Sequence, residues 1–376
     1  MNILSLFSGG GIGESRLEEV GFTVVCGVEL IESRCDFFSR IHNSSIINGD
    51  LRLNSIKQEV YKLSMSKNID IIMATPPCQG MSIAGNMKFD DVRNTLIFEA
   101  VDIIRKIKPK YVFLENVPRQ LSTFVNYNNN TIKIPEYIYA ALKDLYNFNK
   151  DMIIKSMDYG VPQMRKRNIM LLSRKDQDFI WSFPKPTNSH VTLKDAISHL
   201  PSIDPVIREG QRETLRLFPD FEQKKQKGLK FSNWHRPPIH NLKHVTIMQK
   251  TPSGCTAFDN EIYYPKKDDG SRVKGHYNHY RRLAWDKPSR SLTQNNGVIS
   301  SLACVHPGRL LIKGNEKQRK YSDARCFTME ELFIISSIKF QNRIPLSTDD
   351  KLIRKIIGEG IPPLLVRKIF EVLPKS

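Results

Sequence analysis

The chain has 376 residues, of which 40% are hydrophobic, and its 57 Lys and Arg against 39 Asp and Glu give a formal net charge of +18. This length suits two lobes, and the hydrophobic content suffices for packed cores. The sequence contains no apolar run near the roughly 18 residues that cross a bilayer, and Met1–Leu6 lacks the basic start of a signal peptide. We therefore expect a soluble, intracellular protein. The charge favours a polyanionic partner, although a Lys-rich proteome would also produce it.

The first 172 residues alternate short apolar runs with amphipathic stretches. This alternation predicts a parallel sheet covered on both faces, with ligands at the carboxyl ends of its strands. The expected strands are Asn2–Phe7, Thr23–Val28, Ile69–Ala74, Tyr111–Glu115 and Asn168–Leu172. The expected helices include Ile12–Val20, Glu32–His42 and Asn94–Lys106.

The composition changes after about residue 175, where prolines, aromatic residues and basic residues mix without a helical period up to about residue 345. This pattern predicts a second, loop-rich lobe. The tail from Lys351 to Val372 is expected to be helical again. We therefore expect a catalytic domain formed by residues 1–175 and 346–376, and a second domain formed by residues 176–345.

A glycine-rich segment, Phe7–Glu14, follows the first expected strand and opens a helix. Glycines at this position let a ligand approach backbone N–H groups at a helix N-terminus. Glu29 ends the second strand, where a carboxylate can accept hydrogen bonds from ribose hydroxyls, and Asp50 occupies a similar position. These residues favour a nucleoside-containing cofactor, although a tight structural turn would have the same sequence.

Cys78 lies on a proline-rich loop, Thr75–Ser82, directly after a buried strand. Such a loop presents the thiol, and the thiolate form of cysteine is a strong nucleophile. A small cysteine packed in a turn is the alternative. The other cysteines, Cys26, Cys35, Cys255, Cys304 and Cys326, form no CxxC pair with it or with one another, so we expect reduced thiols and no zinc site.

Two further segments carry charged residues beside strands. Glu115 ends an apolar strand, where its pKa could be raised for proton donation, and a solvated strand-end carboxylate is the alternative. Arg165 and Arg167 alternate with Met164 and Lys166 in Gly160–Arg167, so the two arginines should point the same way if this segment is extended. Such a pair suits a phosphate or a carbonyl oxygen, and a solvated basic strand edge would look similar.

Taken together and in this order, these segments resemble the DNA cytosine-5 methyltransferase family. The resemblance covers nearly all of the chain outside about 175–280. It extends to Asp91–Leu96, to the spaced residues Arg325, Thr328 and Glu331 that brace the family's recognition lobe, and to Gly358–Pro363. The chain departs from the family at Ser5, where an Asp often stands, and at Ile12, Arg16, Pro76 and Glu359.

The resemblance implies a Rossmann-like sheet that binds S-adenosylmethionine, with a smaller target-recognition domain, and no metal. It implies that Cys78 adds to C6 of a flipped-out cytosine, that Glu115 contacts N3, and that Arg165 contacts O2, before methyl transfer to C5. The cofactor residues would be Phe7, Ser8, Gly9, Gly11, Glu29, Leu30, Asp50, Pro77 and Leu96. The DNA-binding residues would be Gln79, Ser82, Asn116, Gln163 and Arg167.

The expected partner is double-stranded DNA, with Lys and Arg of about 205–310 on phosphates, and a restriction endonuclease encoded elsewhere is a further expected partner. We expect a monomer in the cytoplasm of a prokaryote or an infected cell. Three alternatives are less consistent with these residues. A tRNA cytosine-5 methyltransferase is suggested by Cys326-Phe327-Thr328, but Thr328 is in register with Arg325 and Glu331. A catalytically silent DNA-binding protein with this fold is disfavoured because every expected catalytic residue is present. A nicotinamide-dependent dehydrogenase is suggested by the glycines, but it does not explain Pro77-Cys78-Gln79.

Overall fold

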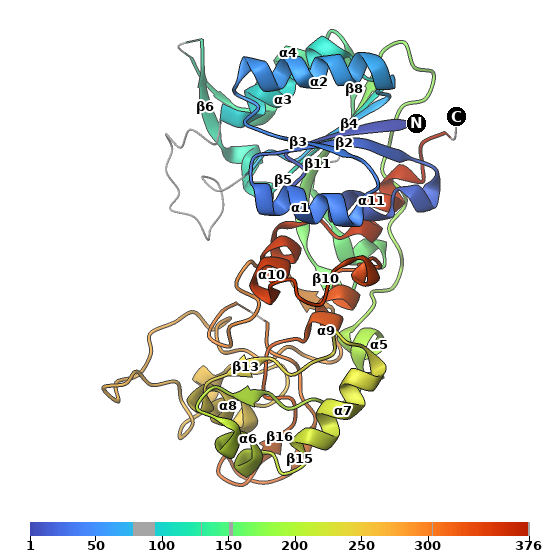
Figure 1. Ribbon diagram of the computed structural model, residues 1–376. Coiled ribbons are helices and arrows are strands. Elements are labelled where there is room, and N and C mark those ends of the chain that lie inside the picture. Colours follow the sequence, from blue (N-terminus) through green and yellow to red (C-terminus); the bar gives the residue numbers. More distant parts are fainter. Residues whose placement is uncertain (78–94, 129, 150–152, 303, 375–376) are drawn as a thin grey trace. The chain divides into compact units, whose positions relative to one another are not determined.

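The computed structural model describes residues 1–77, 95–128, 130–149, 153–302 and 304–374, and its contacts divide the chain into two compact units (Figure 1). Unit 1 contains Met1–Tyr159, Lys166–Thr187 and Gly360–Ser376, and unit 2 contains Gly160–Arg165 and Asn188–Glu359. The boundaries therefore lie at other residues than the expected 175 and 346. The largest difference is that residues 346–359 belong to unit 2.

Unit 1 is built on an eight-stranded sheet whose strand order is β3-β2-β1-β4-β5-β11-β8, with β9 paired to β11. The first five strands in this order are parallel, whereas β11 is antiparallel to β5, β8 and β9. The expectation of a parallel sheet was therefore wrong at one edge. The reason is that β8 already runs in the direction of β5, and β11 returns between them as an antiparallel strand.

The elements of unit 1 agree closely with the expected strands but include several short ones that the sequence pattern did not indicate. Its strands are β1 (Asn2–Leu6), β2 (Thr23–Glu29), β3 (Ser45–Asn48), β4 (Ile71–Ala74), β5 (Tyr111–Asn116), β6 (Phe124–Tyr127), β7 (Asn130–Lys133), β8 (Tyr146–Phe148), β9 (Ile153–Lys155) and β11 (Lys166–Arg174). Its helices are α1 (Glu32–Ile41), α2 (Asn54–Lys67), α3 (Leu96–Ile107), α4 (Ile134–Leu142) and α11 (Pro363–Phe370), with the 3-10 helices η1 (Gly13–Arg16), η2 (Glu18–Val20), η4 (Pro118–Ser122) and η5 (Ser156–Tyr159).

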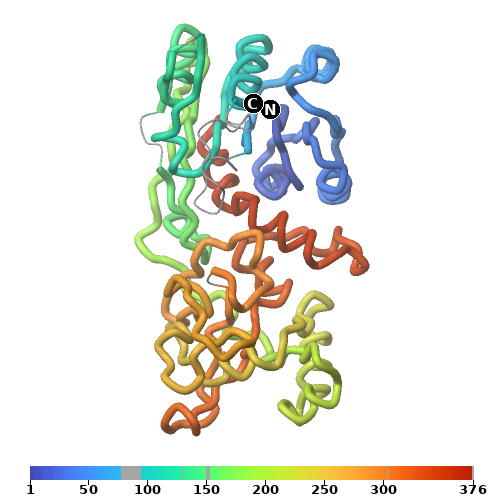
Figure 2. Tube along the Cα trace, turned by 90° about the vertical axis from the view of Figure 1, so that its left-hand side faces the viewer, coloured from blue at the N-terminus to red at the C-terminus, as the bar shows by residue number. Residues whose placement is uncertain are grey.

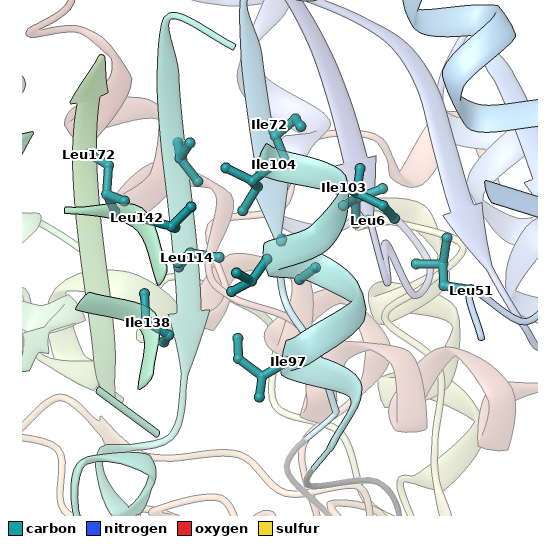
Figure 3. Close-up of a cluster of buried hydrophobic side chains, with 14 of the residues drawn as sticks. Leu6, Leu51, Ile72, Ile97, Ile103, Ile104, Leu114, Ile138, Leu142 and Leu172 are labelled. Atoms are coloured by element: carbon teal, nitrogen blue, oxygen red, sulfur yellow. The ribbon is translucent and has the colours of Figure 1, made fainter. Parts of the chain in front are cut away.

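Helices cover both faces of this sheet (Figure 1). On one face, α2, α3 and α4 pack on the strands through a continuous apolar cluster, part of which Figure 3 shows. In α3 the buried residues Ile97, Ala100, Val101 and Ile104 recur at helical spacing, which explains why this segment forms a helix against the sheet. The other face carries α1 and α11, and α11 packs beside η1, so the red end of the trace lies next to its blue start (Figure 2).

The expected helix Ile12–Val20 is two short 3-10 helices, η1 and η2, so this expectation was wrong in type. Gly13 is buried at the start of η1, where a Cβ atom would lie 3.1 Å from Met73 and 3.5 Å from Val366. Glycine weakens an α-helix, and this close approach fixes the segment against α11. The expected C-terminal helix is also two helices, because Gly360-Ile361-Pro362 separates α10 (Asp350–Glu359) from α11.

Unit 2 contains mostly loops between short elements. Its strands are β10 (Gln163–Met164), β12 (Val206–Ile207), β13 (Ile239–His240), β14 (Ser289–Arg290), β15 (Leu310–Ile312) and β16 (Lys320–Tyr321). Its helices are α5 (Leu193–Ile197), α6 (Gln211–Leu217), α7 (Phe221–Phe231), α8 (Leu242–Lys250), α9 (Met329–Ile335) and α10, with η6 (Ala257–Asp259) and η7 (Gln341–Arg343). Arg354 of α10 donates to the carbonyl of Phe327 at 2.8 Å, which ties this helix to unit 2. Across the described ranges, no helix has the length and apolar character needed to cross a membrane.

Candidate active site

The carboxyl ends of β1, β2, β4 and β5 lie at the same edge of the sheet because these strands are parallel. Backbone and side-chain hydrogen bonds join the segments that follow them. The Ser8 N–H donates to the carbonyl of Val28 at 3.0 Å, and the Thr75 hydroxyl donates to the carbonyl of Phe7 at 2.9 Å. The glycine-rich loop, the end of β2 and the start of the cysteine loop therefore form one continuous edge.

The glycine-rich loop turns sharply at this edge. Phe7, Gly9 and Gly11 have φ angles of 57°, 55° and 71°, in the left-handed region that glycine adopts without strain. The Gly9 N–H donates to Oε2 of Glu29 at 2.9 Å, and the Gly11 N–H donates to the carbonyl of Ser8 at 2.9 Å. The loop is thus held in one conformation by its own backbone and by the carboxylate at the end of β2.

Glu29 and Leu30 have the properties that an adenosyl cofactor requires. The carboxylate of Glu29 is buried and accepts one N–H on each oxygen, from Gly9 and from Ile31, both at 2.9 Å. A carboxylate has about four lone-pair positions, so it can accept ribose hydroxyls in addition. The side chain of Leu30 is 59% exposed and provides an apolar surface beside it. The residues of this edge therefore fit S-adenosylmethionine.

Asp50 follows β3 at the same edge and binds Arg52. Its Oδ1 accepts the backbone N–H of Arg52 at 2.9 Å, and its Oδ2 lies 2.5 Å from Nη2 of Arg52. The hydrogen bond from Arg52 lowers the pKa of Asp50 below its ordinary value. Asp50 is thus an ionised acceptor, with Arg52 as a competing partner for any ligand that it binds.

The cysteine loop begins within the described residues and continues outside them. Asn116, at the end of β5, donates from Nδ2 to the carbonyl of Pro76 at 3.0 Å, and its Oδ1 accepts the Val117 N–H at 2.9 Å. Pro77 is half-buried next in the chain, and Leu96, half-buried, starts α3 where the description resumes. The predicted residues Cys78, Gln79 and Ser82 lie outside the described residues.

Glu115 and Arg167 form an ion pair between neighbouring strands. The register of β5 and β11 places Ile169 opposite Glu115, so Arg167, two residues earlier, projects from the same face and reaches the carboxylate diagonally. Nε of Arg167 lies 2.5 Å from Oε1 of Glu115, and both side chains are largely buried. The guanidinium also donates from Nη1 to the carbonyl of Lys166 at 2.8 Å.

Arg165 and Arg167 contact different groups. The expectation that they point the same way required one extended segment, whereas Arg165 lies between β10 and β11 and belongs to neither strand. The Arg165 guanidinium is buried in unit 2, where it donates to the carbonyls of Leu292 (3.0 Å), Gly358 (3.0 Å) and Glu359 (2.7 Å). Gln163, also buried in unit 2, accepts the Leu292 N–H at 3.4 Å.

The spaced residues Arg325, Thr328 and Glu331 meet in a buried network of unit 2. Arg325 donates to both oxygens of Glu331, at 2.7 and 2.9 Å, and to Asp323 at 2.9 Å. Thr328 caps α9 by accepting the Glu331 N–H. Burial alone would raise the pKa of Glu331, but Arg325 and the nearby His306 lower it to about 2. This network fixes the loops of unit 2 and contains no exposed group for catalysis.

The structure also identifies contacts that the sequence patterns missed. Arg167 pairs with Glu115, Arg34 approaches Glu29 at 3.7 Å, and His42 binds the carbonyl of Gly11. Two of these contacts join segments more than 30 residues apart in sequence, so no local pattern indicates them. The sequence shows that Arg167 and Ile169 lie on the same face of one strand. It does not show that β5 is the neighbouring strand or that Glu115 lies opposite Ile169.

The fold and this edge define a Rossmann-like methyltransferase. A model of the family described as C-5 cytosine-specific DNA methylase matches residues 1–375. Type II methyltransferase M1.HgaI of Avibacterium volantium is 38% identical over 97% of this chain and 96% of its own length. Type II methyltransferase M.HhaI of Haemophilus parahaemolyticus is 38% identical over 34% of this chain and 38% of its own.

Solved structures share the same fold at low sequence identity. A Spodoptera frugiperda DNMT2 variant aligns with a TM-score of 0.57 and 16% identity, covering 98% of each chain. Because the family model matches residues 1–375 and M1.HgaI is 38% identical over 97% of the chain, the chain belongs to the C-5 cytosine-specific DNA methylase family. It is a DNA cytosine-5 methyltransferase, and membership of this family implies the use of S-adenosylmethionine.

Proposed function

We propose that this enzyme methylates C5 of a cytosine that is flipped out of a specific double-stranded DNA sequence, through a covalent bond between Cys78 and C6. The observation that carries the proposal is the position of the Glu115–Arg167 pair. It lies at the end of β5, next to Asn116, whose side chain binds the loop two residues before Cys78. A carboxylate and a guanidinium beside the segment that leads to Cys78 suit the activation of a cytosine ring.

Cytosine is a poor nucleophile at C5, so its ring must first be activated. Attack of the Cys78 thiolate forms the S–C6 bond and shifts the C5–C6 electron pair toward C5. Glu115 would contact N3 and stabilise the charge that develops in the ring. Bound S-adenosylmethionine would supply an electrophilic methyl group to C5, and S-adenosylhomocysteine would be the leaving group. Removal of the C5 proton then restores the C5–C6 double bond and releases the Cys78 thiolate.

We assign to Arg167 the role at O2 that the sequence suggested for Arg165. Arg167 is the arginine that binds Glu115, and a guanidinium with five N–H groups can contact both a carboxylate and a ring carbonyl. Arg165 would instead maintain the backbone of unit 2, since three carbonyls already accept its N–H groups. Cys78 and Glu115 keep their proposed catalytic roles.

The proposed cofactor site is the edge formed by the glycine-rich loop, β2 and β3. The residues proposed for it are Phe7, Ser8, Gly9, Gly11, Glu29, Leu30, Asp50, Pro77 and Leu96. Glu29 would accept the ribose hydroxyls, and Leu30 would cover the adenine ring. Asp50 would accept from the adenine amino group only in competition with Arg52.

DNA contacts are proposed for Gln79, Ser82, Asn116, Gln163 and Arg167, together with a basic hairpin of unit 2 formed by residues 265–273. Lys266 and Arg272 face each other across this hairpin, and Arg272 stacks on Tyr264 at 4.5 Å. Asp269 accepts the Ser271 N–H within the hairpin, and Asp268 lies 3.3 Å from Lys243 of α8. The exposed positive charges of the hairpin are therefore suited to phosphates.

Double-stranded DNA is the proposed substrate, and a separately encoded restriction endonuclease is the proposed partner of the same modification system. Both M1.HgaI and M.HhaI carry the name Type II methyltransferase, which supports this proposal. The enzyme would act as a monomer on DNA in the cytoplasm. A tRNA substrate is less well supported, because Cys326-Phe327-Thr328 is fully buried in the core of unit 2.

One experiment tests the chemistry and the substrate together. The full chain is incubated with methyl-labelled S-adenosylmethionine and either duplex DNA or tRNA, and methylated DNA is read by bisulfite sequencing. We expect label at one cytosine of a fixed duplex sequence, and a trapped covalent complex on duplexes that carry 5-fluorocytosine there. Cys78→Ser should give neither the label nor the trapped complex, but it should still bind DNA. Cys255→Ser should give the label and the trapped complex and should also bind DNA. Label on tRNA alone, or full turnover by Cys78→Ser, would contradict the proposal.

A further inference from the structure

We propose that His42 is a positioning residue that holds the glycine-rich loop in the conformation that binds S-adenosylmethionine. The inference depends on the proposed function because it takes this loop as the cofactor site. His42 directly follows α1, is 7% exposed, and lies 31 residues from the loop in sequence. Its Nε2 atom is 2.8 Å from the carbonyl oxygen of Gly11.

The polarity of this hydrogen bond is fixed by its acceptor. A carbonyl oxygen only accepts, so Nε2 of His42 must carry the proton and donate it. The ring cannot turn away easily, because it packs on Phe38 with centroids 4.4 Å apart and an interplanar angle of 32°. The backbone N–H of His42 also donates to the carbonyl of Phe38 at 2.9 Å, which fixes His42 at the end of α1.

The bond matters because it sets the direction of the peptide between Gly11 and Ile12. In a trans peptide the C=O and N–H groups point in opposite directions. Holding the Gly11 oxygen toward His42 therefore directs the Ile12 N–H to the other side of the loop. The peptide of a glycine can rotate easily, so the free loop could adopt several conformations. A side chain that holds the peptide in one orientation lowers the free-energy cost of ordering the loop when the cofactor binds.

The space around Gly11 shows that His42 and Phe38 form the surface on which the loop rests. A Cβ atom at Gly11 would lie 2.5 Å from Nε2 of His42 and 2.6 Å from Cδ2 of Phe38. A Cβ atom at Gly27 of β2 would lie 2.8 Å from the Phe38 ring and 2.9 Å from Oγ of Ser8. The loop backbone is thus in direct contact with the end of α1, and any change in this support should alter the loop.

The test compares variants that separate the donor from the packing. His42→Phe keeps a ring on Phe38 and removes the donor, and His42→Gln keeps an N–H donor. Calorimetric titration of the full chain, without DNA, with S-adenosylmethionine and S-adenosylhomocysteine measures Kd. We expect His42→Phe to raise Kd for each ligand by about tenfold, because one hydrogen bond of ordinary strength is lost. His42→Gln should raise Kd by less than about threefold. The Phe variant should raise KM for S-adenosylmethionine and keep kcat.

Val60→Ala is the matched control, because Val60 is fully buried in α2 of the same unit and has no part in the loop. It should lower the melting temperature and leave Kd unchanged. The inference would be overturned if His42→Phe lowered the melting temperature, as Val60→Ala does, but bound both ligands with the wild-type Kd. His42→Leu repeats the measurement if the Phe variant does not fold. A wild-type chain that binds neither ligand would overturn the proposed function, and with it this inference.

Discussion

The Nε atom of Arg167 lies 2.5 Å from Oε1 of Glu115, and this pair links the antiparallel strands β5 and β11 at the edge where the cysteine loop begins. A short ion pair between largely buried side chains is screened little by solvent and restricts the movement of both partners. The pair therefore holds the carboxylate in one position before any base arrives. Arg165, two residues earlier, donates to three carbonyls of unit 2.

Arg167→Met should lower kcat for DNA methylation by about 10²- to 10³-fold, since it removes a donor directed at developing charge. Arg167→Lys should recover only part of this loss, because an ammonium group lacks the planar fork of donors that could contact both Glu115 and a ring carbonyl. Single-turnover methylation of a duplex provides the measurement. Arg174→Met is the control, because Arg174 lies in the same strand and pairs with Asp176 at the surface.

Arg165→Met should instead lower the stability of unit 2 by about 2–4 kcal/mol, because it leaves buried carbonyls without donors. Thermal unfolding measures this loss, and methylation at a temperature where the variant is folded should stay within a few-fold of the wild type. The opposite result, a fully folded Arg165→Met with a catalytic defect as large as that of Arg167→Met, would restore the assignment made from the sequence.

Glu14 should make unit 1 less stable at neutral pH than at acidic pH. Burial raises the pKa of Glu14 to about 7, and the hydrogen bond from Ser5 only partly opposes this. The unfolded chain releases this proton near its ordinary pKa of 4.5, so stability falls as the pH rises from about 4.5 to 7 and then remains constant. The loss should reach about 3 kcal/mol, since each pKa unit is worth about 1.4 kcal/mol.

Glu14→Gln should abolish that pH dependence, because the amide has the same shape and does not ionise. Urea unfolding at pH 5 and pH 8 measures the free energy of unfolding of both chains. Glu18→Gln, a neighbouring and exposed position, is the control and should keep the wild-type difference. An equal pH dependence in wild type and Glu14→Gln would show that Glu14 is not the responsible group.

Glu331 should contribute to acid unfolding of unit 2. Its pKa in the folded chain is about 2, below the ordinary 4.5, so its contribution is present above pH 4.5 and is lost as the pH falls toward 2. Glu331→Gln should lower stability at pH 7 and flatten the acid limb of the unfolding curve. Arg325→Met should cost more, about 3–5 kcal/mol, because it leaves Asp323 and Glu331 as unpaired buried charges. Equal losses for the two variants would argue against this reasoning.

The hairpin of unit 2 should set part of the salt dependence of DNA binding. Replacing Lys266, Lys267 and Arg272 with Gln should reduce the slope of log K against log salt by about 0.9 for each phosphate that the variant no longer neutralises. Fluorescence anisotropy of a labelled duplex between low and moderate salt gives the slope. Gln substitutions at Lys62, Lys67 and Lys106 remove the same charge from unit 1 and should leave the slope unchanged. An unchanged slope in the hairpin variant would exclude phosphate binding there.

The sequence by itself determined the alternation of strands and helices in unit 1, the position of its functional segments after strands, and the family. It could do so because apolar periodicity and strand-end glycines and carboxylates are local properties, which a run of a few residues expresses. The strands β1, β2, β4 and β5 lie close to their expected bounds for this reason. Glu29 and Glu115 were proposed as site residues in the same way.

The tertiary structure decided what depends on distant partners. The direction of β11, the assignment of α10 to unit 2, and the pairing of Glu115 with Arg167 follow from strand register and from contacts between remote segments. His42 shows the same limit, since its hydrogen bond to Gly11 spans 31 residues. Contacts of this kind are set by how elements pack, and a linear pattern does not encode which elements become neighbours.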